Sequence, residues 1–188
     1  MEDLRIRRTK KLIQDATMQL IDEKGFANVR IVDIASRAGV NRNTIYLHYE
    51  TKEDIIISMV DEAFANSGAV LNFNEILKSE KRITRKKLTN IFEMLFKTID
   101  ENIELYRIVL TDPNLSGYLD KRILKIRTVV LNTVKPTKRN NIGIEYLVSG
   151  IYGVVQKWII YGTGTIEDNV KILTEFTFIN YSYLLITR

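Results

Sequence analysis

Apolar residues recur at helical spacing along almost the whole 188-residue chain, and this periodicity limits the possible folds more than any other feature. Only two prolines, Pro113 and Pro136, interrupt the pattern. No run of alternating polar and apolar residues bounded by paired turns indicates strands. Hydrophobic residues make up 45% of the chain, which is ample for a core. We therefore predict an all-α protein of about nine helices.

The first two predicted helices carry recognisable end signals. The first covers residues 9–24 and ends at Gly25, where a residue in the left-handed conformation would terminate a helix. The second has apolar residues at offsets 0, 3, 4 and 7 from Ile31 and ends at Gly39.

The third and fourth helices are predicted from their amino-terminal caps. Asn41 is placed to accept a hydrogen bond from the first turn of a short helix that ends near Tyr49. Thr51 and Asp54 form an approximate capping box, so a long helix is expected from position 52 to about 69. We expect this helix to join two parts of the protein rigidly.

The rest of the chain is predicted to be a larger helical domain. Its polar segment 72–82 is expected to be a connection. The further helices are predicted at 84–102, 103–111, 116–134, 140–161 and 165–186. The expected domains are therefore residues 1–51 and residues 52–188.

Composition argues against most chemical functions. The chain has no cysteine and one histidine, so disulfides, thiolate nucleophiles and most transition-metal sites have no ligands. The carboxylates are scattered, and no nucleophile stands at a spacing that would activate it. We expect no enzymatic activity, no metal and no cofactor.

No stretch of about 18 uncharged apolar residues occurs, and the amino terminus lacks the pattern of a signal peptide, so a cytoplasmic protein without membrane contact is expected.

Three residues have the spacing of a helix-turn-helix. Ala35 lets a second helix approach, Gly39 permits the turn, and Ile45 fills the crevice between two helices that cross at a steep angle. At about 100° per residue, Tyr49 points inward with Ile45. A generic helical hairpin is the alternative, but it does not require this combination.

The outward face of the third helix is rich in hydrogen-bonding groups. Asn43, Tyr46 and Leu47 point away from the seam, and Arg42 lies on the exposed first turn. Arginine and asparagine can contact base edges in a major groove, whereas tyrosine, histidine and lysine can donate to phosphate oxygens. This face is therefore predicted to bind duplex DNA, which a net charge of +5 permits.

Residues 9–56 resemble the DNA-binding region of the TetR family of bacterial transcriptional regulators. The motifs that carry the resemblance are Gly25-Phe26, Ile34-Ala35, Ala38-Gly39-Val40, Tyr46-Leu47-His48-Tyr49 and Lys52-Glu53. The penultimate helix also resembles a carboxy-terminal type common in such regulators from low-GC Gram-positive bacteria.

The resemblance implies a role for each matching position. Bases would be contacted by Arg42, Asn43 and Leu47; phosphates by Thr44, Tyr46, His48 and Lys52; and the domain core would include Ala35, Gly39, Ile45 and Tyr49. Arg30 stands where the family usually has a capping serine or threonine, so that cap is lost, although this arginine could reach a phosphate or base. Each of these polar residues could instead be solvated surface.

Further basic residues precede the first predicted helix or open it. They are Arg5, Arg7, Arg8, Lys10 and Lys11. Such an arm can lie along or within a minor groove, or it can be a solvated tail.

The last two helices are predicted to dimerise. Gly150 and Gly153 lie inside a predicted helix, where glycine costs about 1 kcal/mol against alanine, and the close approach of another helix would compensate. In the family such helices form a homodimer interface, which here implies Ile151, Val154, Trp158, Leu173 and Phe176. Alternatively, these residues complete the core of one protomer.

The family also implies a small-molecule pocket in the middle helices. Its candidate residues are Phe92, Phe96, Tyr106, Tyr118 and Tyr152. An aromatic stripe of this kind could equally be plain core.

The function expected from this resemblance is transcriptional regulation. A homodimer would bind a palindromic operator, act as a repressor and respond to a small-molecule effector. The alternative is a ligand-sensing co-regulator of the same fold that has lost operator binding.

Overall fold

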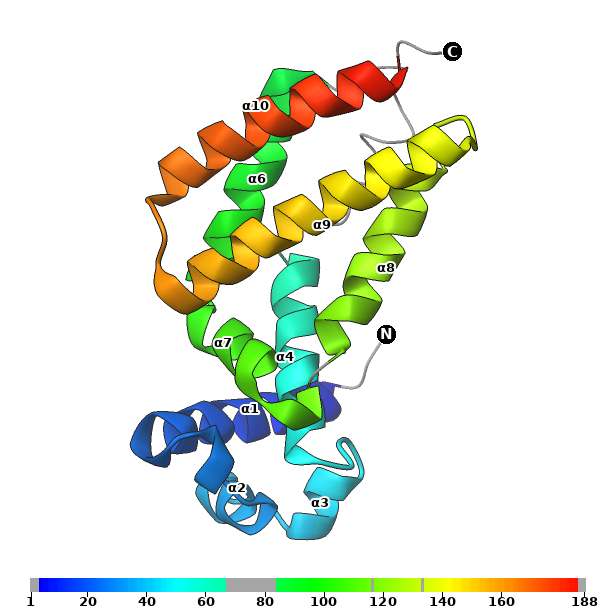
Figure 1. The fold of residues 1–188 in the computed structure, drawn as a ribbon. Helices are drawn as coiled ribbons and strands as arrows, with labels where there is room; N and C mark the ends of the chain where they lie inside the picture. Colours follow the sequence, from blue (N-terminus) through cyan, green and yellow to red (C-terminus); the bar gives the residue numbers. More distant parts are fainter. Residues whose placement is uncertain (1–3, 67–83, 116, 133, 186–188) are drawn as a thin grey trace.

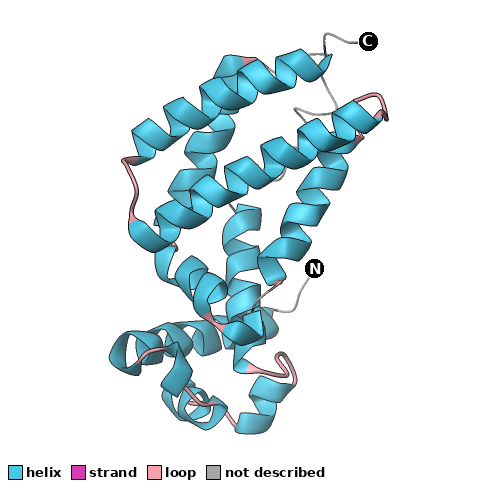
Figure 2. Cartoon of the chain, viewed as in Figure 1, coloured by secondary structure: helices cyan, strands magenta, loops and turns pink. Residues whose placement is uncertain are grey.

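The structure, a computed structural model, describes residues 4–66, 84–115, 117–132 and 134–185, and these residues are almost entirely helical (Figure 1). Figure 2 shows no strand in the described residues, so the all-α prediction is confirmed. Nine α-helices lie within these ranges: α1 (Leu4–Lys24), α2 (Ile31–Ala38), α3 (Arg42–Tyr46), α4 (Lys52–Asn66), α6 (Arg85–Asp100), α7 (Ile103–Thr111), α8 (Tyr118–Leu131), α9 (Lys138–Tyr161) and α10 (Ile166–Leu185). Short 3₁₀ turns occupy Phe26–Asn28 and Pro113–Leu115.

Two helix ends in the amino-terminal part differ from the prediction. The first helix begins at Leu4, so the basic residues near the amino terminus lie in its first turns and not in an extended arm. The third helix ends at Tyr46, because the amides of His48 and Tyr49 both turn back to the carbonyl of Ile45. The connection predicted at 72–82 lies outside the described residues.

The predicted caps are present. The side chain of Asn41 accepts a hydrogen bond of 2.8 Å from the backbone N–H of Asn43 at the start of α3. At the start of α4, the hydroxyl of Thr51 accepts from the amide of Asp54, and the carboxylate of Asp54 accepts from the amide of Thr51. Both caps satisfy amide groups that a helix leaves without partners.

The helices α1, α2 and α3 form a small unit at one end of the molecule (Figure 1). Its core contains Ile13, Ile34 and Ile45, whose side chains are fully buried. The helix α4 leaves this unit and packs against both α1 and α7, so it connects the unit to the remaining helices.

The remaining helices form a larger bundle. In it α10 lies along α6, while α9 contacts α7, α8 and α10. The rings of Phe96 and Trp158 meet edge to face in its core, with centroids 4.9 Å apart. A smaller apolar cluster around Ile144 joins α8, α9 and α10. Among the described helices, none combines the length and apolarity that crossing a membrane would require.

Candidate nucleic-acid interface

Apolar contacts on the inner side of α3 hold this helix in place. Ile45 is fully buried, and Ala35 on α2 and Tyr49 after α3 are also buried. Gly39 has φ 65° and ψ 30°, a left-handed conformation that glycine adopts without the steric cost other residues meet. The turn, the small residue and the isoleucine together fix the direction of α3 relative to α2.

The residues that the family resemblance assigns to bases are exposed on the outer side of α3. Arg42, Asn43 and Leu47 are all exposed, Leu47 by 80% of its surface. The guanidinium group of Arg42 donates hydrogen bonds of 2.7 and 3.1 Å to the hydroxyl of Tyr46 and lies 5.2 Å from the centroid of its ring. Because Tyr46 orients Arg42, less side-chain freedom remains to be lost when this face meets a partner.

The residues assigned to phosphates are placed less uniformly. Tyr46 is exposed, whereas Thr44, His48 and Lys52 are half-buried. The ammonium group of Lys52 donates to the carbonyl oxygens of Phe26 at 2.9 Å and Ala27 at 3.3 Å. Lys52 therefore joins the start of α4 to the 3₁₀ turn after α1.

Arg30 belongs to an ionic cluster at the start of α2. Its backbone N–H and its guanidinium group both donate to the carboxylate of Asp33, which also accepts a hydrogen bond of 2.7 Å from Lys24. The hydrogen bonds from Arg30 and Lys24 hold the pKa of Asp33 far below its usual range. Asp33 therefore caps the amide of Arg30, whereas Arg30 gives the first-turn amides no side-chain cap.

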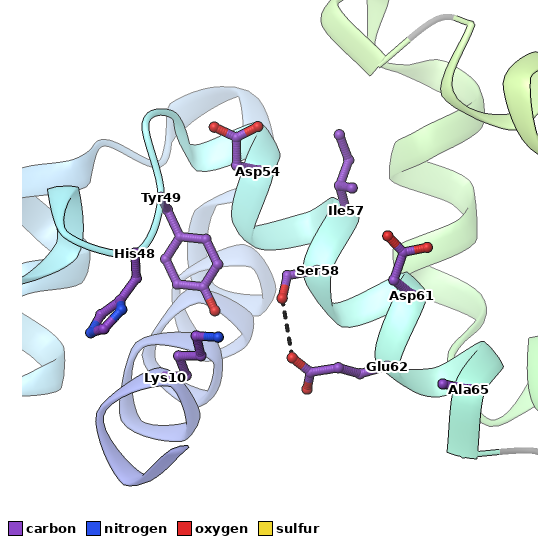
Figure 3. A pocket seen from close by; sticks show the side chains of 9 residues that line it. All are labelled: Lys10, His48, Tyr49, Asp54, Ile57, Ser58, Asp61, Glu62 and Ala65. Carbon is purple, nitrogen blue, oxygen red and sulfur yellow. Dashed lines mark hydrogen bonds between the residues drawn. The ribbon is translucent and has the colours of Figure 1, made fainter. Parts of the chain in front are cut away.

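An open groove of about 540 Å³ runs between α1 and α4, beside the turn that follows α3 (Figure 3). Its lining residues come from these three elements: Lys10, His48, Tyr49, Asp54, Ile57, Ser58, Asp61, Glu62 and Ala65. The sequence singled out His48 and Tyr49 for other reasons and did not indicate a groove.

The structure separates the residues predicted for the dimer interface. Trp158 and Leu173 are buried in the protomer's own core, and Ile151 and Val154 pack against that core. Phe176 alone of the five is exposed. Two of the five residues are thus buried in the protomer, two are half-buried and one is exposed.

The residues predicted for an effector pocket are divided in the same way. Phe92, Phe96 and Tyr106 are buried among packed side chains, and Tyr118 and Tyr152 are half-buried on α8 and α9. Burial raises the pKa of both Tyr118 and Tyr152.

A second set of apolar side chains, which sequence reasoning missed and which we call the outer stripe, is exposed on the last two helices. Its exposed members are Ile142, Tyr146, Tyr161, Ile172, Phe176 and Ile179. Gly150 and Gly153 lie between the first two and Tyr161 on α9, at the spacing of one helix face. The glycines were the only signal in the sequence that pointed to this side of α9.

Comparison with known proteins accounts for the α1–α4 arrangement. Residues 13–59 match the model of the family described as bacterial regulatory proteins, tetR family. The fatty acid metabolism regulator protein of Bacillus subtilis is 29% identical over 154 residues, which cover 80% of this chain and 77% of that protein. The chain belongs to the TetR family. It is therefore a DNA-binding transcriptional regulator.

Solved structures of TetR-family proteins share the fold over almost the full length. A regulator from Mesorhizobium loti superposes with a TM-score of 0.65 at 13% identity, covering 96% of this chain and 98% of that chain. The Thermus thermophilus repressor FadR, solved with lauroyl-CoA, superposes with a TM-score of 0.60 at 15% identity, covering 90% and 93%. At these identities the likeness concerns the fold alone.

Proposed function

We propose that this TetR-family regulator is a repressor that binds a palindromic operator as a homodimer and is controlled by a small-molecule effector. Residues 1–51 would bind the operator, and residues 52–188 would bind the effector and dimerise. The observation that carries operator binding is the geometry of α3, whose polar side is exposed while Ile45 anchors its other side. Arg42, Asn43 and Leu47 would face bases, and Tyr46 and His48 would contact phosphates.

Dimerisation is supported by the glycines of α9. An added Cβ at Gly150 or Gly153 would meet no atom of the chain's described residues within 4 Å. Packing in the protomer therefore does not explain two residues that each cost a helix about 1 kcal/mol. A helix of a second copy, approaching closely at this point, would explain them.

The surroundings of the glycines fit the same partner. Tyr146 and Phe176 are 71% and 65% exposed, and they belong to the outer stripe on α9 and α10 described above. Exposed apolar side chains on two neighbouring helices favour burial against the same helices of another copy. The interface we propose is therefore this outer stripe, with Phe176 kept from the original set.

Operator binding is tested by selection from random duplexes with the purified protein. A two-fold dimer should enrich a palindrome whose half-sites lie about 34 Å apart, and its affinity should fall steeply with salt. If no duplex is enriched and binding does not depend on salt, the operator proposal is wrong. The co-regulator alternative would then be favoured.

Dimerisation is tested by Gly150→Leu, which adds bulk where the protomer has room. The variant should fold but sediment as a monomer at concentrations where the wild type is a dimer. Asn90→Leu places the same side chain at an exposed position of α6 and should remain dimeric. A dimeric Gly150→Leu protein would rule out this face.

Effector control is supported by the relatives, and they also indicate a first ligand class to test. The Bacillus subtilis relative is a fatty acid metabolism regulator, and the Thermus thermophilus structure contains lauroyl-CoA. We therefore propose an acyl thioester that binds next to Tyr118 and Tyr152. At about 100 times its dissociation constant, such a ligand should stabilise the protein by about 2.7 kcal/mol, which a thermal shift detects. If lauroyl-CoA changes neither the melting temperature nor operator binding, this ligand class is wrong.

A further inference from the structure

Two adjacent carboxylates in one turn of α4 bind helices that lie on different sides of α4. Glu62 accepts hydrogen bonds of 3.0 Å from Gln14 on α1 and 3.1 Å from Ser58. Asp61 instead accepts from Arg122 and Tyr118 on α8. Figure 3 shows the two carboxylates pointing away from each other, with Glu62 turned toward Ser58. Polar contacts at one level of α4 thus reach both the DNA-binding unit and the larger bundle.

On the α8 side, four residues form a cluster that we call the latch: Asp61, Phe64, Tyr118 and Arg122. The hydroxyl of Tyr118 donates to Asp61 at 2.6 Å and accepts from Arg122 at 2.7 Å. The guanidinium group of Arg122 also donates to Asp61 and lies 4.5 Å from the centroid of the Phe64 ring. A single arginine of α8 therefore holds two residues of α4 that lie three positions apart.

The latch combines an ion pair with a ring contact, and its arginine is partly shielded from water. The side chain of Arg122 is only 22% exposed, and its planar group both stacks on a ring and pairs with a carboxylate. Burial and the bond to Asp61 raise the pKa of Tyr118, so its hydroxyl remains a donor. Asp61 is 54% exposed, however, so water can replace its contacts when the latch opens.

The latch lies in the second half of α4, far from the point where this helix leaves the α1–α3 unit. Asp61 is about 14 Å along α4 from Lys52, the residue that joins α4 to the 3₁₀ turn after α1. Because α4 is one continuous helix between these points, its tilt at Asp61 sets the position of the α1–α3 unit relative to the larger bundle. In a dimer, that position determines the distance between the two copies of α3.

We propose that Asp61, Tyr118 and Arg122 are positioning residues that determine the half-site spacing this regulator accepts. The proposal deepens the operator binding proposed above and rests on it for one of its two tests. The residues do not contact DNA, because they act through the tilt of α4.

The first test needs no DNA. Hydrogen exchange of the backbone amides of α4 is measured in full-length wild type, Arg122→Gln, Asp61→Asn and the double variant. Each single change should speed exchange in the second half of α4 about tenfold, and the double variant should add little, because both changes break the same contact. Wild-type exchange rates in both single variants, or fully additive rates in the double variant, would overturn the proposal.

A matched control and a rescue separate the latch from general damage. Arg127→Gln breaks an ion pair between α8 and Glu145 on α9, and should leave exchange in α4 unchanged. Exchanging the partners, by Asp61→Arg with Arg122→Asp, should restore at least part of the protection. Equal loosening of α4 by Arg127→Gln would show that the contact has no special role.

The second test measures spacing. Duplex selection with Arg122→Gln should yield half-sites at a wider range of distances than the wild type, while the sequence of each half-site stays the same. An unchanged range of distances would overturn the positioning role. If the wild type selects no operator, the proposed function fails, and hydrogen exchange still decides whether the latch holds α4.

Discussion

The ammonium group of Lys52 donates a hydrogen bond of 2.9 Å to the carbonyl oxygen of Phe26 and lies 4.4 Å from the centroid of the same residue's ring. The bond joins the first residue of α4 to the turn after α1, across 26 positions of sequence. The family resemblance assigns this lysine to a phosphate. In the structure, its ammonium group already has partners within the protein.

Lys52→Met should therefore destabilise the protein as well as weaken DNA binding. Loss of a charged hydrogen bond and of the ring contact should lower the free energy of unfolding by about 1–2 kcal/mol in urea denaturation. Lys11→Met is the control, because its exposed pair with Asp15 should contribute less than about 1 kcal/mol. Equal losses in the two variants would argue against the structural role.

Arg42→Ala should reduce sequence preference more than it reduces affinity for unrelated duplexes. If Arg42 contacts a base pair of the operator, its loss should cost about 1–3 kcal/mol of discrimination at that pair. His48→Ala should instead weaken binding to all duplexes, since phosphate contacts carry little sequence information. Competition binding with single-base operator variants measures both effects. An Arg42→Ala protein with intact preference would show that this residue does not read bases.

Asn41→Ala should destabilise the start of α3. The side chain of Asn41 caps the amide of Asn43, and loss of such a cap costs about 1 kcal/mol. Asn41→Ser retains a capping oxygen and should unfold close to the wild-type temperature. Thermal unfolding followed by circular dichroism compares the three proteins. The interpretation fails if serine and alanine have the same effect.

The cluster around Asp33 should give the protein a specific sensitivity to acid. Because Arg30 and Lys24 lower the pKa of Asp33 in the folded state, its ionised form stabilises the fold above the unfolded pKa of about 3.9. This stabilisation is lost as the pH falls from that value toward the folded pKa. Asp33→Asn should therefore differ from the wild type most above about pH 5 and least in stronger acid. Urea denaturation across this range measures the difference, and parallel curves at all pH values would contradict it.

Trp158, the single tryptophan, distinguishes the two possible faces of α9. Its side chain is 8% exposed and packs on Phe96 inside the protomer. Its fluorescence emission should therefore stay at short wavelength when Gly150→Leu converts the protein to monomers. A shift to long wavelength on dissociation would show that Trp158 faces the partner.

Local signals allowed the DNA-binding unit to be predicted in detail. The turn at Gly39 and the cap at Asn41 depend on residues a few positions away, and so does the burial of Ile45 between two short helices. Helix ends were less accurate, because the exit from α3 at Tyr46 depends on how the following loop enters α4.

The larger bundle shows where such reasoning stops. The helix α9 is apolar around most of its circumference, so periodicity did not indicate which stripe faces the protomer core. Trp158 and Leu173 were assigned to the surface between protomers, but neighbouring helices bury them.

The sequence by itself determined the helical class, the turn at Gly39 and the cap at Asn41, because these depend on residues a few positions apart. Only the tertiary structure decided which face of α9 is outside, that Lys52 bonds to Phe26, and that Asp61 meets Arg122. These contacts join residues 26 and 61 positions apart. The sequence around a charged residue does not indicate which distant residue will lie next to it once the helices have packed.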